Sequence, residues 1–147
     1  MKYLVILCLF FFSFTATEPM RVFLIGDSTM ADKVSADFPE TGWGMPFSQL
    51  FNEAVEVQNH AYNGRSTKSF RREGRWAKVF NQIKKGDYVL IQFGHNDAKV
   101  SDTSRYAPTQ TDFRENLIRY VRETRSKGGI PILLTPTQRR KFDSTGV

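Results

Sequence analysis

Four short apolar runs divide this 147-residue chain and constrain its fold more than any other feature. The runs cover residues 21–25, 54–58, 88–93 and 130–135. Three of them are almost continuously apolar, which is typical of parallel strands that are buried on both faces. Between the runs, apolar side chains recur at spacings of three and four residues, which predicts amphipathic helices at 45–52, 75–85 and 112–127. This alternation predicts one α/β domain with right-handed crossovers, a three-layer α/β/α sandwich around a parallel sheet.

The first 17 residues have the pattern of a secretory signal peptide. Lys2 precedes the apolar stretch 4–12, and small polar residues follow at 13–17. The stretch is shorter than the ~20 apolar residues that span a bilayer, so we expect cleavage and no stable membrane insertion, with a signal anchor as the alternative. The mature domain, residues 21–147, is then expected to be secreted, either extracellular or periplasmic. Cys8 is the single cysteine and lies in the leader, so the mature domain would have no disulfide.

The chain is basic, with a formal net charge of +6. The cationic residues concentrate in one segment: Arg65, Lys68, Arg71, Arg72, Arg75 and Lys78. Such a patch is compatible with nucleic acid, an anionic lipid or an acidic substrate, and export makes nucleic acid the least expected of these partners. A solvated helix face that keeps the protein soluble is an equally good interpretation at this point.

Three polar motifs follow the first three apolar runs. They are Gly-Asp-Ser-Thr at 26–29, Asn-Gly-Arg-Ser at 63–66 and Gly-His-Asn-Asp at 94–97. In parallel sheets, ligands bind at the carboxyl ends of the strands, so we expect the three motifs to meet at one edge. Their common position is stronger support for a site than any one of the motifs.

The three motifs together contain the groups that acyl transfer needs. Ser28 lies where a strand turns, which suits a nucleophile. The main-chain N–H groups of Ser28 and Gly64 and the side-chain amide of Asn96 could stabilise the oxyanion that forms on attack. Taken singly, the motifs are also compatible with an Asx or Ser turn, a tight turn and a loop cap. Met30 replaces the second glycine of the Gly-x-Ser-x-Gly elbow of α/β-hydrolases, and no phosphate-binding glycine loop supports a flavodoxin-like nucleotide site.

The three motifs resemble the conserved blocks of the SGNH (GDSL-type) hydrolases, and within them the rhamnogalacturonan acetylesterase-like branch. The resemblance runs from about residue 21 to residue 137 and includes Thr-Gly-Trp-Gly at 41–44. It implies a flavodoxin-like SGNH fold with Ser28 as nucleophile and Gly64 and Asn96 as oxyanion donors. It also implies Trp43 as a wall of the substrate cleft, no metal or cofactor, and an acetylated pectic or related polysaccharide as substrate. The basic patch, with Arg65, Arg71 and Arg72, would then face uronate carboxylates.

One block of that family is absent from this sequence. The family carries its catalytic acid and histidine as Asp-x-x-His near the C-terminus. The two histidines here are His60 and His95, and the residues three positions before them are Val57 and Gln92 instead of Asp. We expect both histidines to be structural, the fold to be incomplete at its C-terminal end, and the chain to be nearly inactive as an esterase. A non-catalytic glycan-binding remnant and an SGNH lipase or thioesterase are the alternatives. A sheet that ends after its fourth strand is also expected to expose an apolar edge and to associate.

Overall fold

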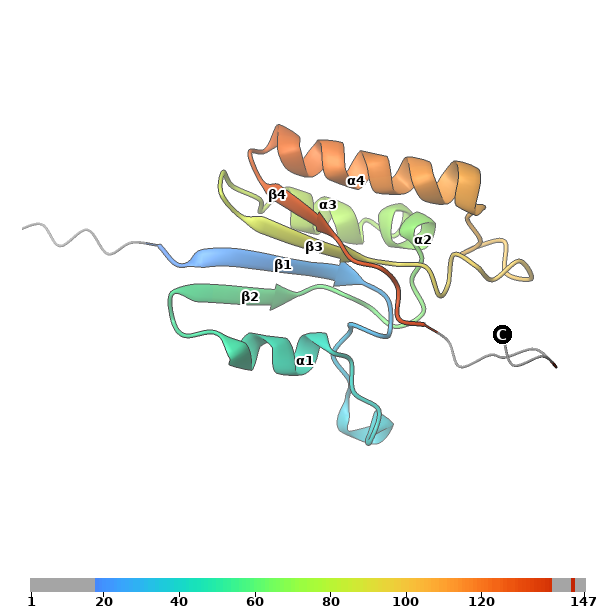
Figure 1. Cartoon of the computed structure of the whole chain (residues 1–147), viewed down its shortest axis with the longest axis horizontal. Coiled ribbons are helices and arrows are strands. Elements are labelled where there is room, and N and C mark those ends of the chain that lie inside the picture. The colour runs from blue at the N-terminus through green and yellow to red at the C-terminus, as the bar shows by residue number, and fades with distance from the viewer. Residues whose placement is uncertain (1–17, 139–143, 145–147) are drawn as a thin grey trace, which may run out of the picture.

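Four parallel strands form one sheet in the order β2-β1-β3-β4 (Figure 1). The computed structural model describes residues 18–138 and residue 144, so the expected signal peptide at 1–17 lies outside the described residues. The strands are β1 (Met20–Gly26), β2 (Val55–Asn59), β3 (Tyr88–Gln92) and β4 (Ile130–Leu133). All four predicted strands are confirmed, each within two residues at either end. Strands β1 and β3 lie in the middle of the sheet, and their buried side chains belong to core clusters on both faces.

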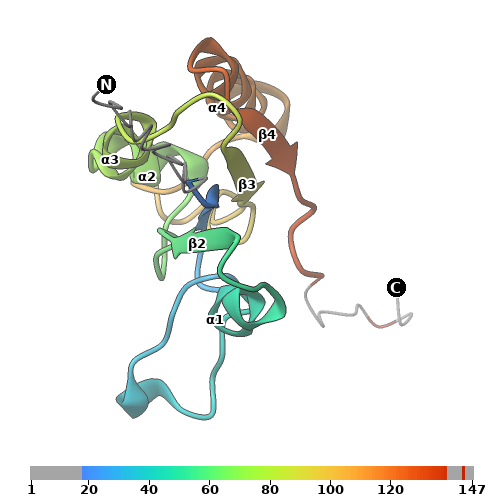
Figure 2. The ribbon, with the colours of Figure 1, turned by 90° about the vertical axis from the view of Figure 1, so that its left-hand side faces the viewer.

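Helices cover both faces of the sheet, as the views in Figures 1 and 2 show. The helices are α1 (Gly44–Phe47), α2 (Thr67–Arg72), α3 (Arg75–Phe80) and α4 (Arg114–Ser126). Short 3₁₀ turns lie at Ser35–Asp37 and Ser48–Leu50, and a π-helical turn at Thr109–Phe113 leads into α4. Helices α2, α3 and α4 lie on one face and α1 lies on the other, which confirms the three-layer α/β/α arrangement.

Alternation along β1 divides the core between the two faces. Phe23 and Ile25 belong to the cluster under α2, α3 and α4, together with Trp76 and Tyr120. Val22, Leu24 and Met30 belong to the opposite cluster, against which Trp43 and Phe47 pack. Because successive side chains of a strand point to opposite faces, a continuous apolar run is what a doubly covered strand requires.

The predicted helices differ from the observed ones in extent. The helix expected at 45–52 is one α-helical turn followed by a 3₁₀ turn, and Leu50 is 75% exposed instead of buried. The helix expected at 75–85 ends at Phe80, because the chain then turns to bury Ile83, and the main-chain N–H of Lys84 donates to Asp87. Helix α2 was not predicted, since Phe70 is the single apolar residue of its six.

Strand β4 leaves apolar surface open to solvent. Ile130, Ile132 and Leu133 are 42%, 37% and 53% exposed. A groove of about 550 Å³ runs between β4 and α4, with Leu117 and Val121 among its lining residues. The expected exposed apolar edge is therefore confirmed for the described residues. Within residues 18–138, none of the helices has the length and apolar character that a membrane span requires.

Candidate active site

The three sequence motifs leave neighbouring strands at one edge of the sheet. Strand β1, which precedes Ser28, lies between β2 and β3, and Gly26 stands beside Gln92 in the register. After β2, the N–H of Tyr62 donates to the carbonyl of Gly26 at 3.0 Å, so the second loop begins against the first. The structure thus brings together the segments that carry Ser28, Gly64 and Asn96.

The turn that holds Ser28 is organised by its neighbour Asp27. The buried Asp27 carboxylate accepts hydrogen bonds from the N–H and the hydroxyl of Thr29, at 3.0 and 2.9 Å. The main-chain carbonyl of Asp27 accepts a hydrogen bond from the N–H of Ala31 at 3.0 Å. Ser28 itself is half-buried, and within residues 18–138 neither its hydroxyl nor its N–H forms a hydrogen bond. The Asx turn therefore exists, but it belongs to Asp27 and leaves Ser28 available.

Gly64 turns the second loop in a backbone conformation that favours glycine, with φ of 76°. The loop is tied at Asn63, whose side-chain oxygen accepts a hydrogen bond from the Lys33 ammonium at 2.8 Å. Lys33 is buried, although its ammonium also pairs with Glu40. Among the described residues the N–H of Gly64 has no hydrogen-bond partner, so this donor is free to face a ligand.

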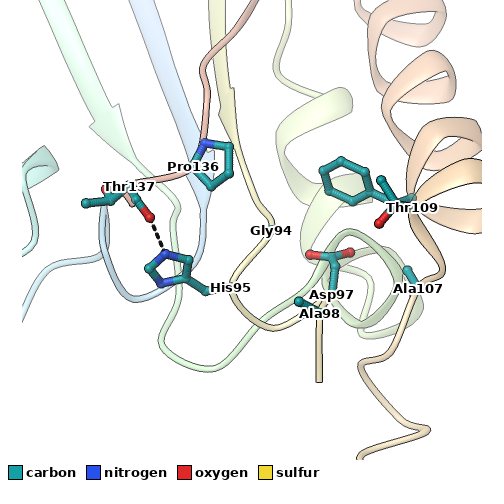
Figure 3. A pocket seen from close by; sticks show the side chains of 9 residues that line it. Gly94, His95, Asp97, Ala98, Ala107, Thr109, Pro136 and Thr137 are labelled. Carbon is teal, nitrogen blue, oxygen red and sulfur yellow. Dashed lines mark hydrogen bonds between the residues drawn. The ribbon is translucent and has the colours of Figure 1, made fainter. Parts of the chain in front are cut away.

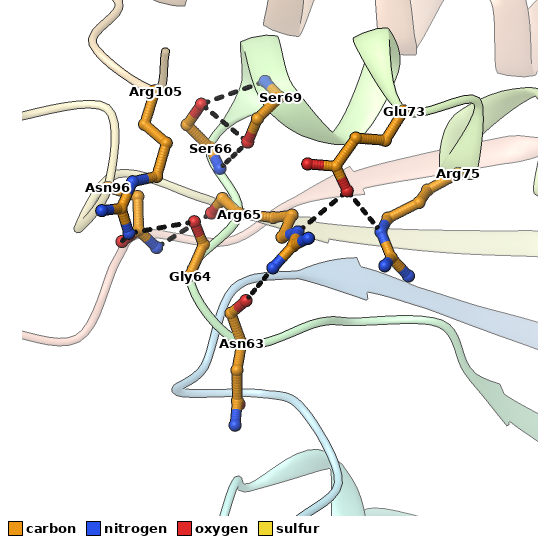
Figure 4. A network of polar contacts seen from close by, with 9 residues as sticks. All are labelled: Asn63, Gly64, Arg65, Ser66, Ser69, Glu73, Arg75, Asn96 and Arg105. Carbon is orange, nitrogen blue, oxygen red and sulfur yellow. Dashed lines mark hydrogen bonds and ion pairs between the residues drawn. The ribbon is translucent and has the colours of Figure 1, made fainter. Parts of the chain in front are cut away.

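Asn96 lies directly against the Gly64 loop (Figure 4). Its buried side chain donates from Nδ2 to the carbonyl of Arg65 at 3.0 Å. The Nη1 atom of Arg105 lies 3.4 Å from both the Asn96 Oδ1 and the Gly64 carbonyl oxygen. An amide nitrogen carries two hydrogens, so one N–H of Asn96 remains for a further acceptor.

Asp97 joins the third loop to α2. Its Oδ1 accepts hydrogen bonds from the N–H and hydroxyl of Thr67 at 2.9 and 2.5 Å. Its Oδ2 is buried and has no partner among the described residues. Burial raises the pKa of Asp97 to about 6. The hydrogen bonds from Thr67 lower this pKa but do not outweigh burial, and the nearby charge of Asp27 raises it by a smaller amount. Figure 3 shows this carboxylate in the wall of a cavity of about 310 Å³ that His95 also lines.

Gln92, the last residue of β3, is a site residue that the sequence interpretation missed. Its Oε1 accepts from the Trp43 indole at 2.6 Å and from the Thr29 hydroxyl at 3.3 Å. Its Nε2 donates to the Thr135 carbonyl at 2.8 Å, beyond β4. A polar residue at the end of an otherwise apolar strand was the signal for it. Lys33 and Arg105 had no comparable signal, because their contacts with the second loop, to Asn63 and Gly64, join residues that are distant in sequence.

Trp43 is held next to the Ser28 turn by its main chain as well. Its N–H donates to the Thr29 carbonyl at 3.0 Å. Gly42 permits this approach, because a Cβ atom there would overlap the carbonyl of Ala31. Trp43 also packs edge-on against Phe47, and its expected role as a wall of the substrate cleft stays a prediction.

Both histidines have structural contacts. His60 packs on Phe23, and its Nε2 lies 3.3 Å from the Gln58 side chain; burial lowers the pKa of His60. The Nε2 of His95 lies 2.5 Å from the carbonyl oxygen of Thr137. These contacts agree with the expectation that neither ring serves Ser28.

Three of the six cations of the basic patch form ion pairs among the described residues. Arg65 and Arg75 both donate to Glu73, each at 2.9 Å, and Arg71 forms a two-pronged ion pair with Glu123 on α4. Glu73 and Glu123 both have lowered pKa values: burial alone would raise them, but hydrogen bonds from these arginines outweigh it.

Arg72 is exposed and has no partner among the described residues. Of the three predicted substrate arginines, Arg65 and Arg72 line a polar cavity of about 240 Å³ beside Gly64, whereas Arg71 faces α4.

The comparisons with known proteins identify the family of this chain. The chain belongs to the GDSL-like lipase/acylhydrolase family, whose model matches residues 24–146. It is 46% identical to rhamnogalacturonan acetylesterase RhgT of Bacillus subtilis (strain 168), over 88% of this chain and 54% of RhgT. It is 33% identical to the probable rhamnogalacturonan acetylesterase YesY of the same strain, over 84% of this chain and 57% of YesY.

A solved structure supports the fold. The crystal structure of the Bacillus subtilis protein YxiM superimposes with a TM-score of 0.73 at 27% identity, over 86% of this chain and 36% of YxiM.

The chain spans little more than half the length of the curated relatives RhgT and YesY. Within the part of the chain that the structure describes, no group of three or more His, Cys, Asp or Glu side chains could hold a metal ion.

Proposed function

We propose that this chain carries the nucleophile and the oxyanion donors of a serine ester hydrolase that removes acetyl groups from a pectic or related polysaccharide. The observation that carries the proposal is the meeting of three loops, in which Asn96 donates to Arg65 beside Gly64, and Tyr62 donates to Gly26 next to Ser28. Membership of a lipase/acylhydrolase family supports the reaction class.

In this mechanism the Ser28 Oγ attacks the acetyl carbon while the carbonyl oxygen becomes an oxyanion. The oxyanion would accept hydrogen bonds from the N–H groups of Ser28 and Gly64 and from Asn96 Nδ2. The Ser28 hydroxyl proton passes to water, the C–O bond to the sugar breaks, and the sugar oxygen takes up a proton from water. A further water then adds its hydroxyl group to the acetyl carbon of the serine ester and returns a proton to the Ser28 Oγ, which releases acetic acid, ionised to acetate at neutral pH. Removal of one such donor typically costs roughly 3 to 4 kcal/mol of transition-state stabilisation.

The substrate class rests on the relatives and on the surface beside Gly64. Two relatives that share 46% and 33% identity with this chain are named as established or probable rhamnogalacturonan acetylesterases. Arg72 is an exposed, unpaired cation in the cavity next to Gly64, where it could meet a uronate carboxylate. An SGNH lipase or thioesterase is the second candidate within the same reaction class.

The rate of this chain should be low. Ser28 needs a base to take its proton, no Asp-x-x-His occurs in the sequence, and His60 and His95 are engaged elsewhere. A preorganised oxyanion hole can still retain a rate of order 10³ to 10⁴ over water. We also propose export, on the strength of the signal-peptide pattern at residues 1–17.

The test is acetate release from acetylated pectin and from p-nitrophenyl acetate by the chain, by Ser28→Ala and by Ser101→Ala as a matched surface control. We expect a slow hydrolysis that Ser28→Ala abolishes and Ser101→Ala leaves unchanged. A hydrolysis rate that Ser28→Ala does not alter would contradict the proposal. Binding of the pectin without any hydrolysis of either substrate would favour the glycan-binding remnant.

A further inference from the structure

Arg105 is a polar contact point between the two loops that carry Gly64 and Asn96 (Figure 4). It lies on the segment between β3 and α4, and its Nη1 atom stands 3.4 Å from both the Asn96 Oδ1 and the Gly64 carbonyl oxygen. Its side chain is 31% exposed, so it forms part of the wall instead of reaching into solvent. Among the described residues, no other cationic side chain lies within hydrogen-bond distance of both Gly64 and Asn96.

The guanidinium group is itself held in place by Asp102. Nε donates to the Asp102 Oδ2 at 2.5 Å, and Nη2 forms an ion pair with the same oxygen. Asp102 also accepts from the N–H and hydroxyl of Ser104, at 3.1 and 2.6 Å. A planar guanidinium that is fixed on one side presents its remaining N–H groups in a defined direction, which a lysine cannot do.

Two contacts, one on Oδ1 and one on Nδ2, set how the Asn96 amide is oriented. An asparagine amide can rotate by half a turn and exchange its oxygen for its nitrogen. With Oδ1 next to a cation and Nδ2 donating to the Arg65 carbonyl, the rotated amide would set an N–H against the guanidinium and an oxygen against a carbonyl oxygen. In the observed orientation Nδ2 retains one N–H that no described residue accepts.

We propose that Arg105 is a positioning residue that fixes the orientation of the Asn96 amide and adds positive charge behind the two oxyanion donors. This inference rests on the proposed function, since it assigns Arg105 to the same oxyanion site. Four of the five guanidinium N–H groups of Arg105 already serve Asp102, Gly64 and Asn96, so we assign it a positioning role and not the role of a substrate ligand. It therefore differs from Arg72, which is unpaired.

The test measures two properties of the same ¹⁵N-labelled proteins by NMR. The first is the exchange of the Asn96 side-chain amide hydrogens with water, which requires no ligand. The second is the affinity for acetate, the product anion, read from the shifts of the Ser28 and Gly64 N–H groups and of Asn96 Nδ2. The variants are Arg105→Ala, Arg105→Lys and Asp102→Asn, with Arg114→Ala, an exposed arginine on α4, as the matched control.

We expect Arg105→Ala to speed the Asn96 amide exchange and to weaken acetate binding, each by about tenfold, the size of losing one charge-assisted hydrogen bond. Arg105→Lys should recover part of the acetate affinity through its charge, Asp102→Asn should give a smaller loss, and Arg114→Ala should change neither property. Unfolding temperatures are measured alongside, because a purely structural role would lower them equally in Arg105→Ala and Asp102→Asn without moving Asn96 selectively.

The experiment distinguishes a failure of the proposed role of Arg105 from a failure of the proposed oxyanion site. If Asn96 exchanges equally in Arg105→Ala and the unchanged chain, the role of Arg105 is overturned, whether or not acetate binds. If acetate leaves Ser28, Gly64 and Asn96 unshifted in the unchanged chain, the proposed oxyanion site is wrong, and the exchange measurement still decides whether Arg105 orients the amide.

Discussion

The side-chain amide of Asn96 lies 3.0 Å from the main-chain carbonyl of Arg65, and this contact joins the loop after β3 to the loop after β2. The two loops are about thirty residues apart in the chain, and each holds one of the proposed oxyanion donors. The donor positions therefore depend on each other, so a change at one loop should disturb the function of the other.

Asn96→Ala should lower kcat for p-nitrophenyl acetate by about 10²- to 10³-fold with little change in KM, because the lost donor acts on the oxyanion and not on the bound ester. Steady-state kinetics of the Ser28-dependent rate measures this. Asn81→Ala, an exposed asparagine after α3, is the control and should have no effect. An unchanged kcat in Asn96→Ala would remove Asn96 from the site.

Asp97 should make the chain less stable as the pH rises from about 4 to 6. Burial raises its pKa from an ordinary 3.8 to about 6, so in this window the folded state binds a proton that the unfolded state has lost. The free energy of unfolding then falls by about 1.4 kcal/mol per pH unit from this group, and the contribution is fully present below the unfolded pKa.

Asp97→Asn removes this titration and keeps a side-chain oxygen for Thr67. Urea unfolding of both proteins between pH 3 and pH 7 should show their stability difference changing across the window and levelling off on either side. A difference that stays constant with pH would show that Asp97 has no raised pKa.

Arg72→Glu should raise KM for an acidic polysaccharide by roughly threefold and leave KM for p-nitrophenyl acetate unchanged, because an exposed charge steers an anionic polymer at modest energy. Added salt should shrink the effect. Arg71→Glu is unsuited to this test, since it would set a carboxylate against Glu123 and destabilise the contact between α2 and α4. Equal changes for both substrates, or none, would refute steering by Arg72.

The exposed β4 edge should make the chain associate. Leu133 is 53% exposed at a strand edge and lines the groove beside α4. Leu133→Lys should reduce association, because a charged residue on an open edge disfavours pairing with another chain. Sedimentation velocity across a concentration series measures this, with Val100→Lys, an exposed apolar residue away from the sheet, as the control. A monomer at all concentrations would contradict the prediction.

The strands and the edge that holds the site could be predicted because they depend on local patterns. Three of the strands are almost continuously apolar, and β2 alternates valine with polar residues. The three motifs share one edge of the sheet because β1, β2 and β3 are parallel. The ends of the helices were harder to predict. Leu50 has the spacing of a buried helical residue, but the chain tightens into a 3₁₀ turn at Ser48 and leaves it exposed.

The contacts that organise the site could not be predicted, since they join residues that are distant in sequence. Lys33 reaches Asn63, Gln92 reaches Trp43, and Arg71 reaches Glu123. Between residues 65 and 78, three of the six cations, Arg65, Arg71 and Arg75, form ion pairs with Glu73 or Glu123. Helix α2 had a local signal, the reciprocal cap between Ser66 and Ser69, but its polar sequence hides the helical period.

The most direct test of the central claim is covalent labelling of the chain with a fluorophosphonate, followed by tryptic mass spectrometry. A phosphonyl group on serine is tetrahedral and places its oxygen where the oxyanion would lie. The tryptic peptide 22–33 contains Ser28 as its one serine. We predict slow, stoichiometric labelling of this peptide that Asn96→Ala slows by about 10²-fold or more. Labelling of a different serine, or an equal rate in Asn96→Ala, would contradict the claim that Ser28, Gly64 and Asn96 form one site.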